Sequence, residues 1–119
     1  MTNIREVSRF IIKCKFAIRN NFIFEWTEKN KLTLIELGYN LDDVEDVITS
    51  LSKADYTKGP LHDLDGYKGD FWLFGRTIQN REIYIKLKIK DFNTTGDKKL
   101  SVYCISFHFA DEPQSNPFK

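Results

Sequence analysis

Alternation of hydrophobic and polar residues predicts a β-hairpin in the middle of the chain. From Glu82 to Lys90 every second residue is Ile or Leu, and the residues between them are charged or Tyr. A period of two with β-branched and aromatic residues is typical of a half-buried strand. The segment from Asp70 to Ile78 predicts the partner strand, and the polar pair Gln79-Asn80 is the natural turn between them.

The turn decides which side chains of this hairpin share a face, because a one-residue slip would turn every side chain over. A loop of two or four residues predicts one apolar face and one mixed face. The residues expected with the isoleucines on the buried face are Trp72, Phe74 and Ile78. Those expected on the solvent face are Phe71, Leu73, Gly75, Tyr84, Lys86, Lys88 and Lys90. The hairpin should therefore present a tyrosine and three lysines outside the core.

Three other segments have the hydrophobic spacing of helices. The first helix is expected from Ile4 to about Asn20, where apolar residues recur every three or four positions. Thr27 is a good N-cap for a second helix that ends at Leu37, with Gly38 as the residue after it. Asn40 or Asp42 can cap a third helix, whose first turn is acidic, as the helix dipole favours.

Two further strands complete the predicted order of elements. Residues 22–26 form a short aromatic strand, and residues 100–109 are apolar on both sides, as in a central strand. Residues 52–69 are expected to be the longest loop, and residues 111–119 a loosely held tail. Helices followed by a run of strands predict a single α+β domain over residues 1–119, with the helices on one face of a mostly antiparallel sheet. The first strand would pair at one edge or beside the last strand.

Composition supports a folded domain and adds a charge asymmetry. The chain has 119 residues, of which 41% are hydrophobic, and a net charge of +1. A chain of this size can bury a core without disulfides or metals. Residues 81–99 hold six Lys and Arg against three acids, whereas residues 40–55 hold five acids against one Lys. We therefore expect a local positive field around the hairpin.

The sequence lacks the residue patterns of several kinds of site, namely metal sites, membrane spans and common enzyme motifs. Two distant cysteines, Cys14 and Cys104, and two histidines do not make a zinc motif, so no metal or other cofactor is expected. The thiols are expected to be buried in a reduced, cytoplasmic protein. No apolar stretch approaches the roughly 20 residues of a membrane span, so no membrane partner is expected. Nucleophile-elbow, Walker and dinucleotide motifs are also missing from the sequence.

What remains is a basic and aromatic set of residues. Tyr84, Lys86 and Lys88 on the hairpin, with Lys58 and His108, suit binding of single-stranded RNA through stacking and phosphate contacts. The same residue types suit metal-free RNA cleavage, in which Tyr or His exchanges a proton and Lys stabilises the developing charge. Two simpler interpretations stay open. A strand Lys often serves solubility, and a His in an apolar strand is often a core residue.

Several short motifs follow one another along the chain in a fixed order. They are Leu37-Gly38, Val44 to Asp55, Lys58, Trp72, Ile83 to Leu87 and Ile105 to Phe107. In their joint order and spacing, collinear from about Phe16 to His108, these motifs resemble the MqsR family of bacterial toxins. This resemblance implies a RelE/ParE-like fold and an mRNA interferase, a metal-free endoribonuclease that a cognate antitoxin neutralises.

The resemblance also implies roles for individual residues. The family's catalytic lysine falls on Lys58, its tyrosine on Tyr84, and its lysine after Ser-Phe falls on His108, a change of type. The family's glutamine after Trp falls on Leu73, which cannot hydrogen-bond to RNA. The residues expected to hold the RNA backbone are Lys86, Lys88 and Arg76.

The leading hypothesis is therefore a toxin RNase of a type II toxin–antitoxin system, with mRNA and an antitoxin protein as partners. In it, Tyr84 positions the phosphate or ribose, His108 acts as acid or base, and Lys58 stabilises charge in the transition state. Two alternatives stay open. One is a RelE/ParE-like toxin that poisons a protein target, and the other is a non-catalytic domain that binds RNA or an antitoxin.

Overall fold

The computed structural model describes residues 2–62, 69–94 and 97–119, and in this part the chain folds into helices packed on a mixed sheet. The helices are α1 (Ile4–Asn20), α2 (Glu28–Leu37) and α3 (Leu41–Thr49), with a short 3-10 helix, η1 (Lys53–Asp55). The strands are β1 (Phe22–Phe24), β2 (Tyr56–His62), β3 (Asp70–Ile78), β4 (Arg81–Thr94) and β5 (Asp97–Phe109). The predicted α+β class is confirmed.

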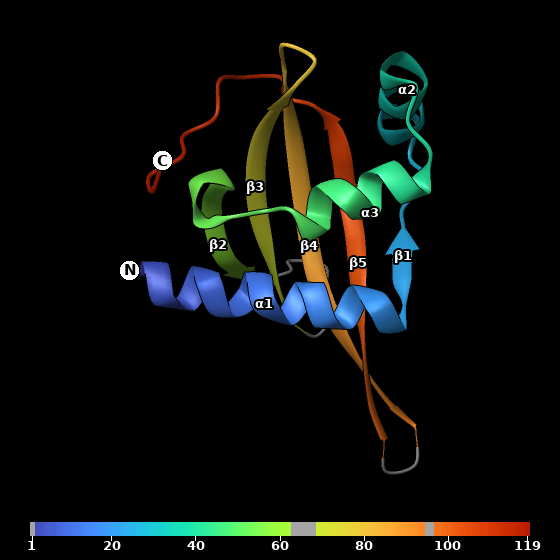
Figure 1. Cartoon of the computed structure of the whole chain (residues 1–119), viewed down its shortest axis with the longest axis vertical. Coiled ribbons are helices and arrows are strands. Elements are labelled where there is room, and N and C mark those ends of the chain that lie inside the picture. The colour runs from blue at the N-terminus through green and yellow to red at the C-terminus, as the bar shows by residue number, and fades with distance from the viewer. Residues whose placement is uncertain (1, 63–68, 95–96) are drawn as a thin grey trace.

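The sheet has the strand order β1-β5-β4-β3-β2 (Figure 1). Strands β2 to β5 are consecutive antiparallel neighbours, and β1 adds to β5 in parallel at one edge. This agrees with the expectation that the first strand pairs at an edge, beside the last strand. The long connection from β1 to β5 runs through two helices and the whole meander.

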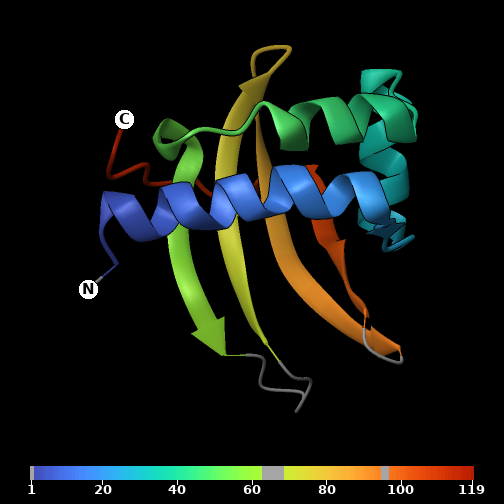
Figure 2. The same ribbon diagram turned by 60° about the horizontal axis from the view of Figure 1, so that its bottom comes forward.

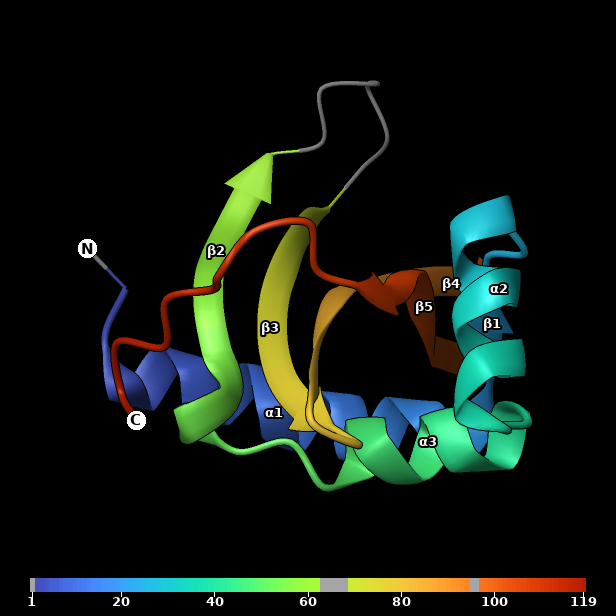
Figure 3. The same cartoon turned by 90° about the horizontal axis from the view of Figure 1, so that it is seen from above.

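The core lies between the sheet and helices α1 and α3. Helix α1 crosses the strands on one face of the sheet, and α3 lies beside it on the same face (Figures 1 and 2). The buried stripe of α1 falls at the spacing expected for one helical face, namely Val7, Phe10, Ile11, Cys14, Ala17 and Ile18. Phe10 stacks on Trp72 with 4.5 Å between ring centroids. Helices α1 and α3 cover one face, as predicted, whereas α2 lies at the edge of the sheet beside β5 (Figure 3). The face opposite α1 and α3 is called the open face below.

The hairpin formed by β3 and β4 has the predicted turn and register. Gln79 and Asn80 both have positive φ, 52° and 65°, as a tight two-residue hairpin turn requires. Ile78 pairs with Arg81 and Gly75 with Tyr84, so the parity argument holds. The residues expected in the core, Trp72, Phe74, Ile83 and Leu87, are all buried. The helix ends also agree, with Thr27 and Asn40 as N-caps and Gly38 in the left-handed conformation.

The prediction of a long loop over residues 52–69 is wrong for the described part of that segment. Residues 53–55 form η1 and residues 56–62 form β2, an edge strand that pairs with β3; residues 63–68 lie outside the described residues. Gly59 does not make a turn. It has φ of 134°, and a Cβ there would lie 3.0 Å from the Cα of Trp72, so glycine permits the close approach of β2 to β3. A proline such as Pro60 is tolerated there because β2 is an edge strand with an irregular register.

The prediction of a loosely held tail is also wrong. Residues 111–115 line a pocket on the open face, and the tail then crosses β3 and β2 and ends near the start of α1 (Figure 3). The Gln114 amide donates to the carbonyl of Ile83 at 3.0 Å, and the ring of Phe118 stacks on Tyr56 with centroids 5.5 Å apart. The sequence suggested a free tail because its two prolines exclude regular secondary structure, but side chains hold it instead.

Candidate functional site

A pocket of about 670 Å³ on the open face contains all three residues that were predicted to be catalytic. Lys58, Tyr84 and His108 come from three different strands, and the register explains why they meet. Tyr84 lies between Gly75 and His108 in one row across the sheet. The next row, from β2 to β5, consists of Lys58, Leu73, Lys86 and Ser106. The pocket therefore joins two neighbouring rows of side chains.

A β-bulge in β5 turns His108 towards this pocket. Lys86 pairs with Ser106 and Leu87 with Cys104, which leaves Ile105 as an extra residue. Before the bulge, the even-numbered Cys104 is buried on the helix side; after it, the odd-numbered Phe107 is buried there. Without the extra residue, His108 would share the helix side with Cys104, because alternate residues of a strand point to opposite faces.

The side chain of Asn30 holds the bulge in place. Asn30 is fully buried on α2, and its amide nitrogen donates to the carbonyls of Ile105 at 3.1 Å and Glu25 at 2.8 Å. Its oxygen accepts from the N–H of Phe107 at 3.0 Å. Strand β1 ends at Phe24, so this part of β5 has no strand on that side among the described residues, and α2 satisfies its main-chain groups instead.

Tyr84 and His108 form a stacked pair in the pocket. Their ring centroids are 5.2 Å apart, with 23° between the ring planes. The Nδ1 atom of His108 lies 3.0 Å from the carbonyl oxygen of Phe109. Because a carbonyl can only accept, Nδ1 carries a proton, and Nε2 is the nitrogen through which the ring can exchange one with a ligand.

The environment of Tyr84 determines which role its phenol can play. Partial burial raises the pKa of Tyr84 above its ordinary value of 10.0, because loss of solvent disfavours the phenolate. At neutral pH the hydroxyl is therefore protonated, and it can donate a hydrogen bond to an anionic oxygen. Of the stacked pair, His108 is the better candidate for a base.

Three lysines border the same pocket: Lys29, which pairs with Asp111, and Lys58 and Lys86 on the sheet. Lys58 is exposed and makes no ion pair with any described residue. Lys86 follows Tyr84 by two residues on β4, and its ammonium lies 4.0 Å from the ring centroid of Phe71. Three strand spacings, about 14 Å, separate the main chains of Lys58 and His108. By register, the main chain of Lys86 is nearer to the stacked pair than that of Lys58, while the Lys86 ammonium lies over Phe71, which pairs with Lys88.

Lys88, which was predicted to face solvent, is buried. It follows the predicted parity and pairs with Phe71, but its exposed fraction is only 1%. The chain at Gly69, where it enters β3, lies against the Lys88 side chain; a Cβ at Gly69 would be 3.5 Å from Lys88 Cε. The expectation that Lys88 faces solvent is wrong, and a buried ammonium cannot contact an RNA backbone as the protein stands.

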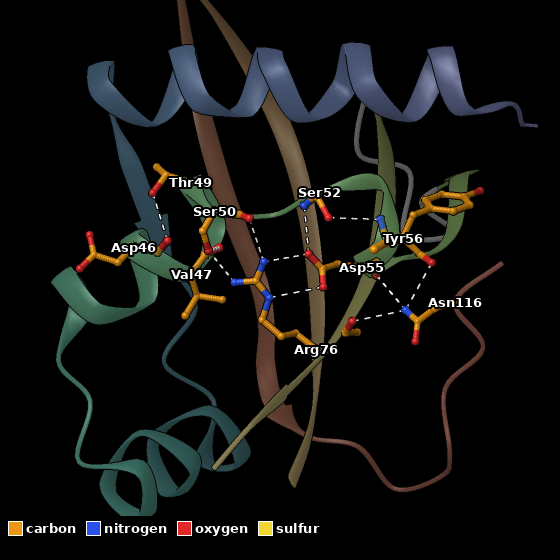
Figure 4. Close-up of polar contacts among 11 residues, drawn as sticks. Asp46, Val47, Thr49, Ser50, Ser52, Asp55, Tyr56, Arg76 and Asn116 are labelled. Atoms are coloured by element: carbon orange, nitrogen blue, oxygen red, sulfur yellow. Dashed lines mark hydrogen bonds and ion pairs between the residues drawn. The ribbon is translucent and has the colours of Figure 1, made fainter. Parts of the chain in front are cut away.

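Arg76, the other residue predicted to bind RNA, is not brought to the pocket. It lies on the helix side of β3, where its Nη2 donates to Asp55 Oδ2 at 2.8 Å and to the Ser50 carbonyl at 2.8 Å (Figure 4). This pair ties β3 to the connection between α3 and β2. Arg76 therefore has a structural partner in place of a ligand.

The tail supplies pocket residues that the sequence did not reveal. Residues 110–115 line one side of the pocket, and Lys29 of α2 approaches Asp111 at 3.3 Å. Gly75, expected on the solvent face, leaves room above the strand, and Gln114 occupies that room. A Cβ at Gly75 would lie 2.6 Å from Gln114 Nε2. The glycine on a strand was the signal that something packs closely there.

The remaining polar and thiol groups do not add a second chemical centre to the described part of the chain. In residues 2–62, 69–94 and 97–119 there is no group of three or more His, Cys, Asp or Glu side chains placed to hold a metal ion. Cys14 and Cys104 are free and buried, as expected. Burial raises the pKa of Cys14 to about 12 and also raises that of Cys104. None of the helices described is both long and apolar enough to cross a membrane.

The pocket is therefore the candidate functional site of this chain. No protein-family model, curated protein or solved structure matches this chain.

Proposed function

We propose that this chain is an mRNA interferase toxin of a type II toxin–antitoxin system, with a RelE/ParE-like fold and a relationship to the MqsR family. One observation carries the proposal. Lys58, Tyr84 and His108 lie in separate segments of the sequence, match the family pattern in order, and line one pocket. The implied partners are mRNA and a cognate antitoxin in the cytoplasm, and no cofactor is required.

The proposed reaction is attack of a ribose 2′-oxygen on the adjacent phosphorus. His108 Nε2 accepts the 2′-hydroxyl proton, the new O–P bond forms, and the bond from phosphorus to the 5′-oxygen breaks. The leaving 5′-oxygen takes up a proton from water, and His108 returns its proton to the solvent. The products are a 2′,3′-cyclic phosphate and a 5′-hydroxyl. Proton transfer of this kind contributes about 10²–10⁴-fold to the rate.

The other pocket residues stabilise the charge that develops on the phosphate. The protonated hydroxyl of Tyr84 donates a hydrogen bond to a non-bridging oxygen, and Lys86 supplies positive charge from the neighbouring position on β4. Lys58 lies further away and is suited to the next phosphate along the strand. Leu73 was expected on the solvent face and does line the pocket, but its exposed fraction is only 8%, so it offers a base little apolar surface and no group that could select its identity.

The positions of two lysines favour a second candidate, a domain that binds RNA without cutting it. The Lys86 ammonium contacts the ring of Phe71, and Lys58 is separated from His108 by two intervening strands. In that case the lysines and the stacked pair form a binding surface for a single strand, and no proton is transferred.

The decisive experiment compares wild type with His108→Ala on a mixed-sequence single-stranded RNA, with and without EDTA. We expect cleavage that survives EDTA, yields cyclic phosphate ends, and falls by about 10²–10⁴-fold in the variant. His62→Ala is the matched control, because this second histidine is paired with Asp70 at 3.0 Å and does not line the pocket. Equal cleavage by wild type and His108→Ala would remove His108 from the mechanism. Binding without cleavage, even with ribosomes added, would favour the second candidate.

A further inference from the structure

We propose that the C-terminal tail, residues 111–118, is an autoinhibitory strap that RNA must displace in order to occupy the pocket. The inference rests on the proposed function, because it concerns access to the same site. In the protein without RNA, the strap would then cover part of the pocket.

The strap is anchored beside the candidate catalytic pair. Gln114 donates to the carbonyl of Ile83, the residue before Tyr84, and its amide lies over Gly75, the residue that pairs with Tyr84. An RNA strand that runs along the row of Tyr84 and His108 towards β3 therefore meets Gln114. The tail sits at the glycine of that row, where the strand itself carries no side chain.

Asn116 and Phe118 fasten the strap further along. The Asn116 amide nitrogen approaches the carbonyls of Asp55 at 3.1 Å, Tyr56 at 3.4 Å and Gly75 at 3.3 Å (Figure 4). The Phe118 ring stacks on Tyr56. These contacts join the tail to η1, β2 and β3. None of them is made to the side chains of Lys58, Tyr84 or His108, so they can be removed without changing a proposed catalytic group.

The charges of the strap resemble those of the proposed ligand. Asp111 and Glu112 line the pocket together with Lys58 and Lys86. Their carboxylates place negative charge at the side of the pocket that a phosphate backbone would approach. Asp111 also pairs with Lys29 at 3.3 Å, where both side chains are largely exposed. Exposed pairs of this kind are weak, so a polyanion can compete with them.

Two polar side-chain atoms at the contact between the strap and the pocket lack hydrogen-bond partners, which favours release of the strap. Gln114 Oε1 and Thr57 Oγ1 are buried without a hydrogen-bond partner among the described residues, and both side chains line the pocket. Burial of a polar group without a partner is destabilising, and opening of the strap would hydrate both atoms. Pro113 and Pro117 have no N–H, so the strap cannot add to the sheet as a regular strand.

Closure of the strap lowers the apparent affinity for RNA by the fraction of molecules that are open. If fewer than about one molecule in ten is open, release of the strap tightens RNA binding by about tenfold or more. The test uses the full chain and a fluorescent single-stranded RNA with 2′-O-methyl groups, which cannot be cleaved, and measures Kd by anisotropy. Tripolyphosphate, followed through the NMR signals of the His108 ring, serves as a second probe that does not depend on RNA recognition.

Asn116→Ala should lower Kd by about tenfold or more, whereas Lys119→Ala, a change in the same tail at an exposed residue, should not lower it. If Asn116→Ala proves unfolded by circular dichroism, Asp111→Asn with Glu112→Gln replaces it, since both side chains are exposed. Hydrogen exchange of residues 111–118 should speed up when RNA binds. Unchanged Kd in the folded variant, or unchanged exchange in the complex, would overturn the strap and leave the proposed function intact.

The two proposals fail in different ways. If Asn116→Ala responds to tripolyphosphate at His108 more strongly than wild type but neither protein binds RNA, the strap stands and the RNA function falls. If neither probe binds either protein, both are overturned.

Discussion

The side-chain oxygen of Asn30 accepts a hydrogen bond from the main-chain N–H of Phe107 at 3.0 Å. This bond and the one from the Asn30 amide to the Ile105 carbonyl together span the bulge of β5. The bulge decides that His108 faces Tyr84 on the open face. A buried polar residue on α2 thus controls the orientation of the His108 side chain on β5.

Asn30→Ala should destabilise the protein by about 2–4 kcal/mol, because it leaves buried main-chain groups of Ile105 and Phe107 without partners. Urea unfolding followed by circular dichroism measures this change. Asn20→Ala is the control, since Asn20 is exposed at the end of α1 and should change the free energy of unfolding by less than about 0.5 kcal/mol. Equal effects of the two substitutions would show that the Asn30 bonds do not stabilise the bulge.

Removal of the Arg76 side chain should affect stability and not RNA binding. Arg76→Ala leaves the Asp55 carboxylate, whose side chain is 15% exposed, without its cation, and we expect a loss of about 1–3 kcal/mol. Glu36→Gln breaks an exposed ion pair with Arg81 and should cost less than about 1 kcal/mol. Anisotropy titrations with RNA should give the same Kd for Arg76→Ala as for wild type. A clear loss of affinity in a folded variant would return Arg76 to the RNA-binding surface.

Neutralising the pocket lysines should reduce the salt dependence of RNA binding. Removal of one phosphate-binding cation lowers the slope of log K against log salt by about 0.7 for a single strand. We therefore expect a decrease of this size for Lys58→Ala and for Lys86→Ala. Lys53→Ala, an exposed residue of η1 that does not line the pocket, should leave the slope unchanged. If the salt slope of all three variants equals that of wild type, Lys58 and Lys86 do not bind phosphates and are ordinary surface residues.

Alkaline pH should destabilise the fold through its buried thiols and Tyr84. In the unfolded chain Cys14 ionises near its ordinary pKa of 9.0, whereas in the native protein burial raises its pKa to about 12. Native Cys14 thus keeps its proton while the unfolded chain loses one, so stability is present below pH ~9 and is lost progressively above it. Cys104 and Tyr84 act in the same direction, because burial raises the pKa of both.

The measurement is urea unfolding between pH 8 and 10.5 for wild type and Cys14→Ala. One proton corresponds to a slope of up to about 1.4 kcal/mol per pH unit, and the variant should lack this contribution. In parallel, a thiol reagent should modify Cys14 and Cys104 only as fast as the protein opens, since both side chains are buried. Rapid modification of the native protein would contradict the burial of the thiols, and an unchanged pH slope in Cys14→Ala would show that Cys14 does not contribute to the alkaline loss of stability.

The sequence by itself determined the features that depend on short-range geometry. Helix caps and the Gln79-Asn80 turn act over a few residues, and the turn sets the parity of the hairpin. Parity then placed Tyr84 and Lys86 on the open face and Trp72 in the core, as the structure has them. Hydrophobic periodicity likewise indicated α1 and the α+β class, because burial of one face of each element is a local requirement.

Only the tertiary structure decided the features that depend on a distant partner. The edge strand β2 forms because β3 pairs with it, although Gly59 and Pro60 are locally turn residues. The bulge that orients His108 is held by Asn30, 75 positions from Ile105. Lys88 obeys the predicted parity yet is buried against the chain at Gly69, and the tail is held through Gln114. Alternation along a strand predicts which way a side chain points, but what covers it there depends on segments that only the folded chain brings together.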